Sequence, residues 1–272
     1  MLEFDFMRRT LMVGFMLSIA VPLIGIIMVN RRTSMVGDAL SHTSLAGVGL
    51  GLIMGFSPVI GAILVCIVSA FSIEGIRKRF PQYGDMAVAV IMSAGLGLAV
   101  ILSDLAPGGN SFEAYLFGSI SAVSNVDVVG TFIVFLAVIA ASVICYGGLL
   151  DLVIDHNLAR LAGVKTKLVN GVFTLLTAIT VALACKVVGA LLVASLIVLP
   201  VASSLIVARS YKQAFMISIV LGIIYTMLGI TVSYYLDVRP GGAIVINAVI
   251  GMLLFLLYAK FRKISNKLPE SL

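Results

Sequence analysis

Asp38 and His42 stand four positions apart in the stretch Gly-Asp-Ala-Leu-Ser-His, which begins at Gly37. In an α-helix this spacing places both side chains on one face. Residues 39–73 contain no Asp, Glu, Lys or Arg, so the pair lies at the edge of a strongly apolar region. Ionisable groups in such a region are costly to bury and usually have a functional role. Carboxylates and imidazoles both bind zinc-like ions, so Asp38 and His42 are the candidate metal ligands.

Two residues of one helix cannot complete the four-ligand shell that zinc usually takes. The remaining ligands must come from other spans, from water or from a symmetry-related copy of the chain. A purely structural role is the alternative, in which Asp38 caps a helix N-terminus and His42 makes an ordinary hydrogen bond. The sequence leaves both interpretations open.

Three glycines follow the pair at intervals of four residues: Gly47, Gly51 and Gly55. Such a stripe of small residues lets a second membrane helix approach closely. It is rotated by roughly 100° from the face that carries Asp38 and His42. One helix can therefore pack tightly on one side and present metal ligands on another.

The composition is that of a membrane protein. Of 272 residues, 61% are hydrophobic and 11% are charged, whereas a soluble domain has about 25% charged residues. We expect an all-α, polytopic bundle of transmembrane helices that forms a single domain over residues 1–272. The net charge of +6 does not indicate nucleic-acid binding, because the basic residues stand in short loops, where they set membrane orientation.

Runs without charged residues predict the membrane spans. The run 39–73 is too long for one pass and has a turn signal at Phe56-Ser57-Pro58, so the eight runs give nine candidate spans. Only Lys186 separates the runs 168–185 and 187–208, so a broken helix there, with eight spans in all, is the alternative. The runs cover residues 10–30, 39–73, 86–103, 128–150, 168–185, 187–208, 213–236 and 241–259.

The distribution of basic residues predicts the orientation. With nine spans and a cytoplasmic C-terminus, 14 of the 18 Lys and Arg residues fall in cytoplasmic loops, as the positive-inside rule requires. The N-terminus is then outside the cell. With eight spans both termini would lie on the same side.

Two connecting segments are expected to form short helices. One is 111–120, in a polar outer loop. The other lies in the cytoplasmic connection 151–167, where Asp155 resembles an N-cap and Gly163 a residue just past a helix end. Between them Leu158, Leu161 and Ala162 share one side, so this helix either lies on lipid or docks on a partner protein.

Motifs of enzymes are missing from the sequence. There is no GxxxxGK[ST] phosphate loop, no HExxH and no GxSxG. We therefore expect neither ATP binding by the usual phosphate loop nor enzymatic activity in this chain.

Several blocks resemble a known family. GDALSHTSLAGVGLG (37–51) is similar to the signature of the membrane permeases of metal-importing ATP-binding-cassette transporters. The resemblance continues, in the same order, with YLFGSI (115–120), DHNLARLAG (155–163) and VGALLVASLIVLPVASSL (188–205). In the first block Ala46 stands where the manganese branch more often has proline, so the sequence resembles the zinc branch.

The resemblance implies an assembly and a cargo. Such permeases form a homodimer in the cell membrane, with two cytoplasmic ATP-binding subunits and an external metal-binding protein. They hold no permanent cofactor: a divalent metal, here most simply Zn²⁺, is cargo, and only the partner binds ATP. Asp38 and His42 match the family's metal-path positions. The segment that would couple to the ATPase is Asp155, His156, Asn157, Leu158, Ala159, Arg160, Leu161, Ala162 and Gly163.

Two other functions remain compatible with these residues. One is a permease of the same type that imports Mn²⁺ or Fe²⁺, because Asp and His bind these ions too. The other is a self-sufficient secondary metal transporter or channel that needs no ATPase.

Overall fold

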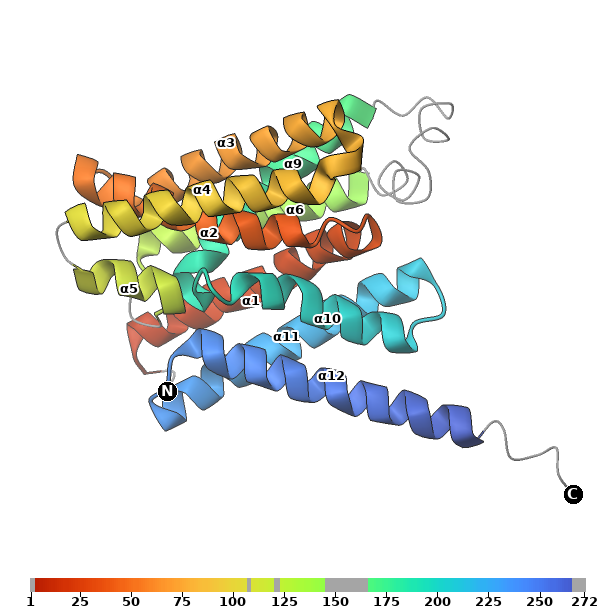
Figure 1. Ribbon diagram of the computed structural model, residues 1–272. Coiled ribbons are helices and arrows are strands. Elements are labelled where there is room, and N and C mark those ends of the chain that lie inside the picture. Colours follow the sequence, from red (N-terminus) through yellow and green to blue (C-terminus); the bar gives the residue numbers. More distant parts are fainter. Residues whose placement is uncertain (1–2, 107–108, 120–122, 145–165, 266–272) are drawn as a thin grey trace, which may run out of the picture.

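A computed structural model of the chain describes residues 3–106, 109–119, 123–144 and 166–265. These residues form a bundle of long helices, and the start of α1 and the end of α12 lie at opposite ends of the bundle (Figure 1). The all-helical prediction is confirmed for this part of the chain. The helices are α1 (Asp5–Asn30), α2 (Met35–Met54), α3 (Pro58–Arg79), α4 (Gly84–Leu105), α5 (Gly109–Phe117), α6 (Asn125–Ile144), α9 (Thr166–Val188), α10 (Val193–Val207), α11 (Tyr211–Leu236) and α12 (Pro240–Ser265).

Seven of the described helices are long and apolar enough to cross a membrane: α1, α3, α4 with the short 3-10 turn before it, α6, α9, α11 and α12. The apolar helix α10 is shorter, at 15 residues. Helix α2 is not among the seven, because Asp38, His42 and several hydroxyl side chains lower its mean hydropathy. The predicted count of eight or nine spans is therefore not confirmed.

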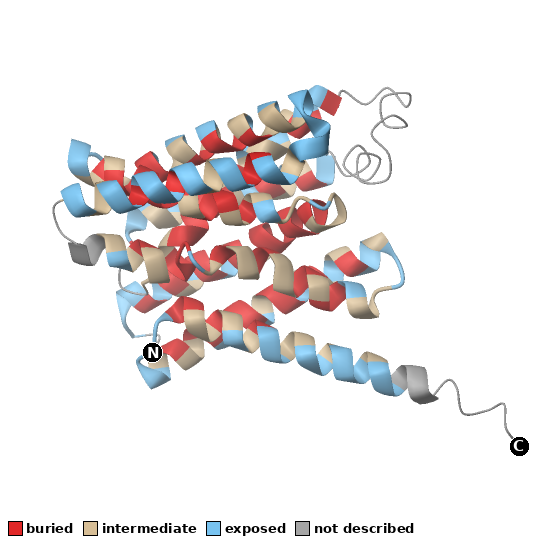
Figure 2. Cartoon of the chain, in the orientation of Figure 1, coloured by how far each residue is buried: buried red, intermediate tan, exposed pale blue. Residues whose placement is uncertain are grey.

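The helix that carries Asp38 and His42 lies at the centre of the bundle. Helix α2 contacts α3, α4, α5, α9 and α10, and most of its residues are buried. Figure 2 shows buried residues concentrated in the inner helices, whereas α12 is largely exposed. The exposed positions carry large apolar side chains, such as Leu64, Val90, Ile133 and Leu254. An apolar exterior around a central helix that carries ionisable side chains suits a chain surrounded by lipid.

The turn between α2 and α3 lies where the sequence predicts it. Gly55 ends α2 in the left-handed conformation with φ +73°, which glycine adopts without a steric penalty. Pro58 is the first residue of α3, a position where its missing N–H costs nothing.

The helix predicted over 187–208 is shorter than expected. Helix α9 continues past Lys186 to Val188, Gly189 turns the chain with φ +95°, and α10 starts only at Val193. A methyl group at Gly189 would lie 2.6 Å from the Gly118 nitrogen, so this turn packs directly against the end of α5. The irregular backbone expected in this region is thus present. It comprises residues 189–192, which therefore do not belong to α10.

Basic residues gather at one end of the bundle, which we call the basic end. It contains the C-terminal ends of α1, α3 and α10 and the starts of α2, α4 and α11 (right in Figure 1). The opposite end, which contains α5, is called the α5 end. The assignment of the basic end to the cytoplasm remains a prediction. The candidate coupling segment 155–163 lies outside the described residues. The basic end carries Arg31, Arg32, Arg77, Lys78, Arg79, Arg209 and Lys212.

Candidate metal path

Helix α2 brings the two candidate ligands together. The Nε2 atom of His42 lies 3.7 Å from Oδ1 of Asp38, and the side chains are 17% and 31% exposed. This distance is longer than a hydrogen bond, so the two groups share a face without being locked to each other. Both are partly accessible from outside the chain, which a ligand site needs.

The spacing of these two atoms is compatible with one metal ion. Two ligands bonded at about 2.1 Å in a tetrahedral shell lie about 3.4 Å apart. The observed 3.7 Å differs from this by a few tenths of an ångström, which side-chain rotation can supply. The backbone of α2 does not have to move.

The purely structural interpretation of the pair finds little support. Ser34, not Asp38, is the N-cap residue of α2, and Asp38 stands one turn inside the helix. The Nδ1 atom of His42 is buried and has no hydrogen-bond partner among the described residues. A metal-binding histidine generally donates its second N–H to an acceptor, so this nitrogen requires a water molecule or another chain.

Asp38 and His42 stand as a pair in the part of the chain that the structure describes. Within the ranges that the structure describes, no group of three or more His, Cys, Asp or Glu residues is placed to hold a metal ion. The neighbouring hydroxyls of α2 are already engaged by their own helix: Ser41 donates to the Asp38 carbonyl at 2.8 Å and Ser44 to the Ser41 carbonyl at 2.6 Å. The described residues thus offer two ligands of these types at this place, Asp38 and His42.

Two of the three predicted packing glycines lie against α3. A methyl group at Gly47 would collide with the carbonyl oxygen of Gly61, and one at Gly51 would lie 2.8 Å from Cα of Pro58. Gly55 has a different role, because nothing lies within 4 Å of a methyl group there. Its contribution is the left-handed turn that ends α2.

Two ion pairs at the α5 end were not found by sequence reasoning. Lys186 Nζ lies 2.6 Å from Asp127 Oδ2, and these side chains are only 14% and 11% exposed. Arg239 Nη2 lies 2.7 Å from Glu113 Oε1, with both side chains about half exposed. The sequence indicated only that acidic residues fall in the outer loops, and their partners are 59 and 126 positions away.

Burial also changes the pKa of a tyrosine at the α5 end. Tyr115 of α5 is nearly buried. Desolvation, with a smaller contribution from the Asp127 carboxylate, raises its pKa to about 12. The Tyr115 phenol is therefore neutral at physiological pH and provides no negative charge to a passing cation.

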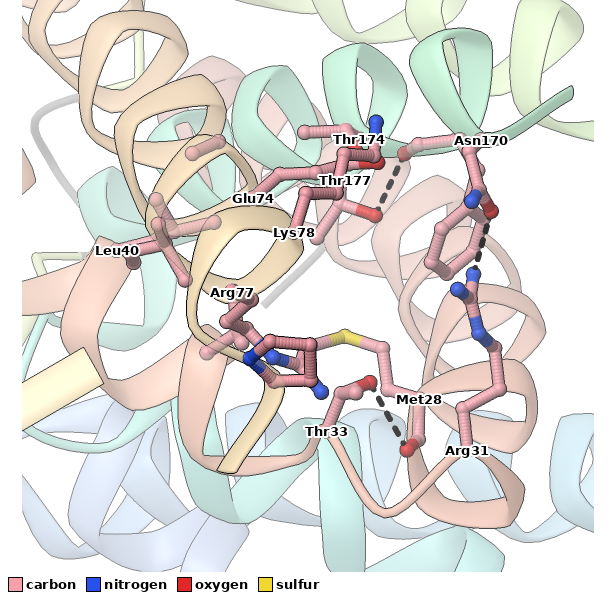
Figure 3. Close-up of a pocket in the computed structure, with 15 residues that line it drawn as sticks. Met28, Arg31, Thr33, Leu40, Glu74, Arg77, Lys78, Asn170, Thr174 and Thr177 are labelled. Carbon is pink, nitrogen blue, oxygen red and sulfur yellow. Dashed lines mark hydrogen bonds and ion pairs between the residues drawn. The ribbon is translucent and has the colours of Figure 1, made fainter. Parts of the chain in front are cut away.

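Each end of the bundle has a cavity. At the α5 end a cavity of ≈ 510 Å³ is lined by Glu113, Asp237 and Arg239 among others. At the basic end a cavity of ≈ 310 Å³ is lined by residues of α1, α2, α3 and α9 (Figure 3). Helix α2 contributes Val36 and Leu40 to the latter, about 200° around the helix from Asp38 and His42. The cavity at the basic end thus lies on the other side of α2 from the candidate ligands.

Comparison with known proteins identifies the family. The ABC 3 transport family matches residues 3–259, which is nearly the whole chain. The chain therefore belongs to the ABC 3 transport family.

Curated relatives align over almost their full length. A probable metal transport system membrane protein of Treponema pallidum is 32% identical, covering 93% of this chain and 96% of the relative. The manganese import system permease protein ScaB of Streptococcus parasanguinis is 29% identical, with 98% and 96% covered. The high-affinity zinc uptake system membrane protein ZnuB of Haemophilus influenzae is 27% identical, with 89% and 94% covered. Relatives named for different metals are thus similarly distant.

A solved structure has the same fold. PsaBC from Streptococcus pneumoniae, determined in complex with a Fab, superimposes with a TM-score of 0.83 at 28% identity, covering 93% of this chain and 91% of that chain. Together with the seven apolar helices, these relatives show that this is a multi-pass protein of the cell membrane.

Proposed function

We propose that this chain is the permease subunit of an ATP-binding-cassette importer that moves a divalent metal ion into the cytoplasm. The observation that carries the proposal is the match of the ABC 3 transport family to residues 3–259. Relatives of similar length are named as metal transport proteins. The chain itself has no phosphate-loop motif, so a separate subunit must bind and hydrolyse ATP.

In this proposal Asp38 and His42 hold the ion transiently during its passage. A carboxylate and an imidazole within 3.7 Å provide two ligands, and water or a second copy of the chain provides the others. An incomplete protein shell suits transport, because a site in a conducting path must release the ion as well as bind it. The partial exposure of both side chains leaves them accessible to such additional ligands.

Zn²⁺ is our expected cargo, with Mn²⁺ and Fe²⁺ as the alternatives. Ala46 within the first motif favours zinc, whereas the relatives include proteins named for manganese and for zinc. One Asp and one His accept all three ions. We therefore propose a divalent transition metal as the cargo, and among these metals we expect zinc.

We expect the working assembly to contain two copies of this chain, two ATP-binding subunits and an external metal-binding protein. The expected site of ATPase contact is the segment 155–163, whose apolar side at Leu158 and Leu161 has the pattern of a docking helix. In the sequence this segment falls in a connection between two predicted spans that the charge pattern assigns to the cytoplasm. ATP hydrolysis would then move this segment and switch the opening between helices.

The experiment that tests the proposal is reconstitution. The chain is inserted into proteoliposomes with and without its ATPase subunit, and uptake of ⁶⁵Zn²⁺ from the external protein is measured. We expect uptake only with the ATPase and ATP. Zinc flux driven by an ion gradient through the chain alone would instead identify a secondary transporter.

A further inference from the structure

The cavity at the basic end has the chemistry of an anion site. It lies between the end of α1, the start of α2, the end of α3 and the first half of α9. Its volume is ≈ 310 Å³, enough for a phosphate group with part of the molecule attached to it. Figure 3 shows Arg31, Arg77 and Lys78 among its lining residues.

The positive charges of this cavity exceed its negative charges. Arg31, Arg77 and Lys78 line it, and Glu74 is its one acidic lining residue in the described part of the chain. Glu74 is already engaged: Lys78 Nζ lies 2.7 Å from its carboxylate, and the hydroxyl of Thr174 donates to it. One cation and the anion thus neutralise each other, and two guanidinium groups remain.

Neither remaining guanidinium has a carboxylate partner within the described ranges. Arg31 donates from Nη1 to the neutral amide oxygen of Asn170 at 2.9 Å, and its guanidinium lies 6.0 Å from the Phe173 ring centre. Arg77 has no hydrogen bond or ion pair with a described residue. Partial burial lowers the pKa of Arg31, the Glu74 carboxylate raises it, and Arg77 lowers it; a guanidinium stays charged at physiological pH. Three basic side chains thus share one carboxylate, and the cavity keeps a net positive charge.

A divalent metal ion does not fit this cavity. The two guanidinium groups repel a dication, and the cavity lies on the side of α2 away from Asp38 and His42. Guanidinium groups instead match the oxygens of a phosphate, which they bind through paired hydrogen bonds. The lining also has an apolar part, which includes Met28, Val36 and Phe173, beside polar side chains such as Asn170 and Thr177.

We propose that the cavity lined by Arg31 and Arg77 binds a phosphate group, supplied by the headgroup of an anionic phospholipid. The apolar part of the lining favours a lipid, since an acyl or glycerol portion can lie against Met28, Val36 and Phe173 while the phosphate meets the two arginines. Basic cavities between membrane helices bind lipid headgroups in this way. The site does not depend on metal transport, so it can be tested whatever the cargo is. Free inorganic phosphate is the other source of the same group.

The test uses the full chain, delipidated in a mild detergent. Binding is followed by native mass spectrometry and by the thermal unfolding midpoint in mixed micelles with phosphatidylglycerol or with phosphatidylcholine. A third arm contains 10–50 mM inorganic phosphate without lipid, roughly the range in which a weak anion site fills. The variants are Arg77→Gln, Arg77→Lys and the control Arg79→Gln. Arg79 belongs to the same helix end but is exposed and outside the cavity.

We expect phosphatidylglycerol to bind and stabilise the wild-type chain more than phosphatidylcholine. Arg77→Gln should weaken this binding roughly fivefold, about the effect of one basic residue at a lipid headgroup, while Arg77→Lys retains most of it and Arg79→Gln changes it little. Stabilisation by inorganic phosphate alone, lost in Arg77→Gln, supports the anion site and assigns it to soluble phosphate. Equal losses in Arg77→Gln and Arg79→Gln, or no preference for phosphate-bearing anions, would overturn the proposal.

Discussion

Lys186 and Asp127 form a nearly buried ion pair that joins the end of α9 to the start of α6. Their charged atoms lie 2.6 Å apart, and the backbone N–H and hydroxyl of Ser124 also donate to Asp127. Lys186 stands three residues before the turn at Gly189. This pair therefore ties the last turn of α9 to the start of α6, close to the turn that leads into α10.

Breaking this pair should destabilise the chain more than breaking the exposed one. Asp127→Asn leaves the ammonium group of Lys186 buried without a counter-charge, which costs on the order of 3 kcal/mol in the free energy of unfolding. Glu113→Gln breaks a pair of nearly the same length, 2.7 Å, that is half exposed, so a loss below about 1 kcal/mol is expected. Denaturant titration in detergent compares the two variants. Equal losses would show that burial does not set the strength of the Asp127 pair.

The packing of α2 on α3 should tolerate no side chain at Gly47. Gly47→Val places its side chain against the backbone of Gly61, and the two helices must separate or the chain must misfold. Gly75→Val is the matched control, since nothing lies within 4 Å of a methyl group at Gly75. Size-exclusion chromatography of fluorescently tagged protein should show a large loss of monodisperse protein for Gly47→Val only. A normal profile for Gly47→Val would contradict the close approach of α2 and α3.

The sequence predicted the helices better than the interactions between them. Apolar runs and turn residues such as Phe56-Ser57-Pro58 locate most helix boundaries within a few residues, because these features are local in the chain. The start of α10 was misplaced, at 187 instead of Val193, because the packing of Gly189 against Gly118 joins positions that are distant in the chain. The same reason explains the missed partners of Asp127 and Glu113.

For the candidate site, the sequence predicted a shared face and no more. The spacing of Asp38 and His42 fixes their proximity through helix geometry alone, and the structure has them within 3.7 Å. The direction in which this face points depends on how α2 packs among five other helices, which no local pattern encodes. The segment 155–163 lies outside the described residues, so its docking role rests on the sequence.

Leu158 should be required for coupling to the ATPase. Leu158→Asp puts a charge on the predicted apolar side of the segment 155–163 and should reduce ATPase association and uptake severalfold, because burying an unpaired carboxylate opposes docking. Co-purification with the ATPase subunit measures the association. Unchanged association and uptake in Leu158→Asp would argue against the docking role.

Metal preference should appear in competition. We expect a tenfold excess of Zn²⁺ to suppress uptake of ⁵⁴Mn²⁺ by the assembled transporter more than the same excess of Mn²⁺ suppresses uptake of ⁶⁵Zn²⁺. The reason is that zinc binds nitrogen and oxygen ligands more tightly than manganese does. Uptake of Mn²⁺ unaffected by zinc would assign manganese as the cargo and reject the zinc expectation.

The central claim is that Asp38 and His42 together hold the transported ion. ATP-driven ⁶⁵Zn²⁺ uptake, with ⁵⁴Mn²⁺ in parallel, is the most direct measurement, made in proteoliposomes that contain the ATPase subunit and equal amounts of wild-type, Asp38→Ala or His42→Ala chain. We predict that uptake of the cargo metal falls at least tenfold in each variant, while assembly with the ATPase is retained. Uptake at the wild-type rate in both variants would contradict the account.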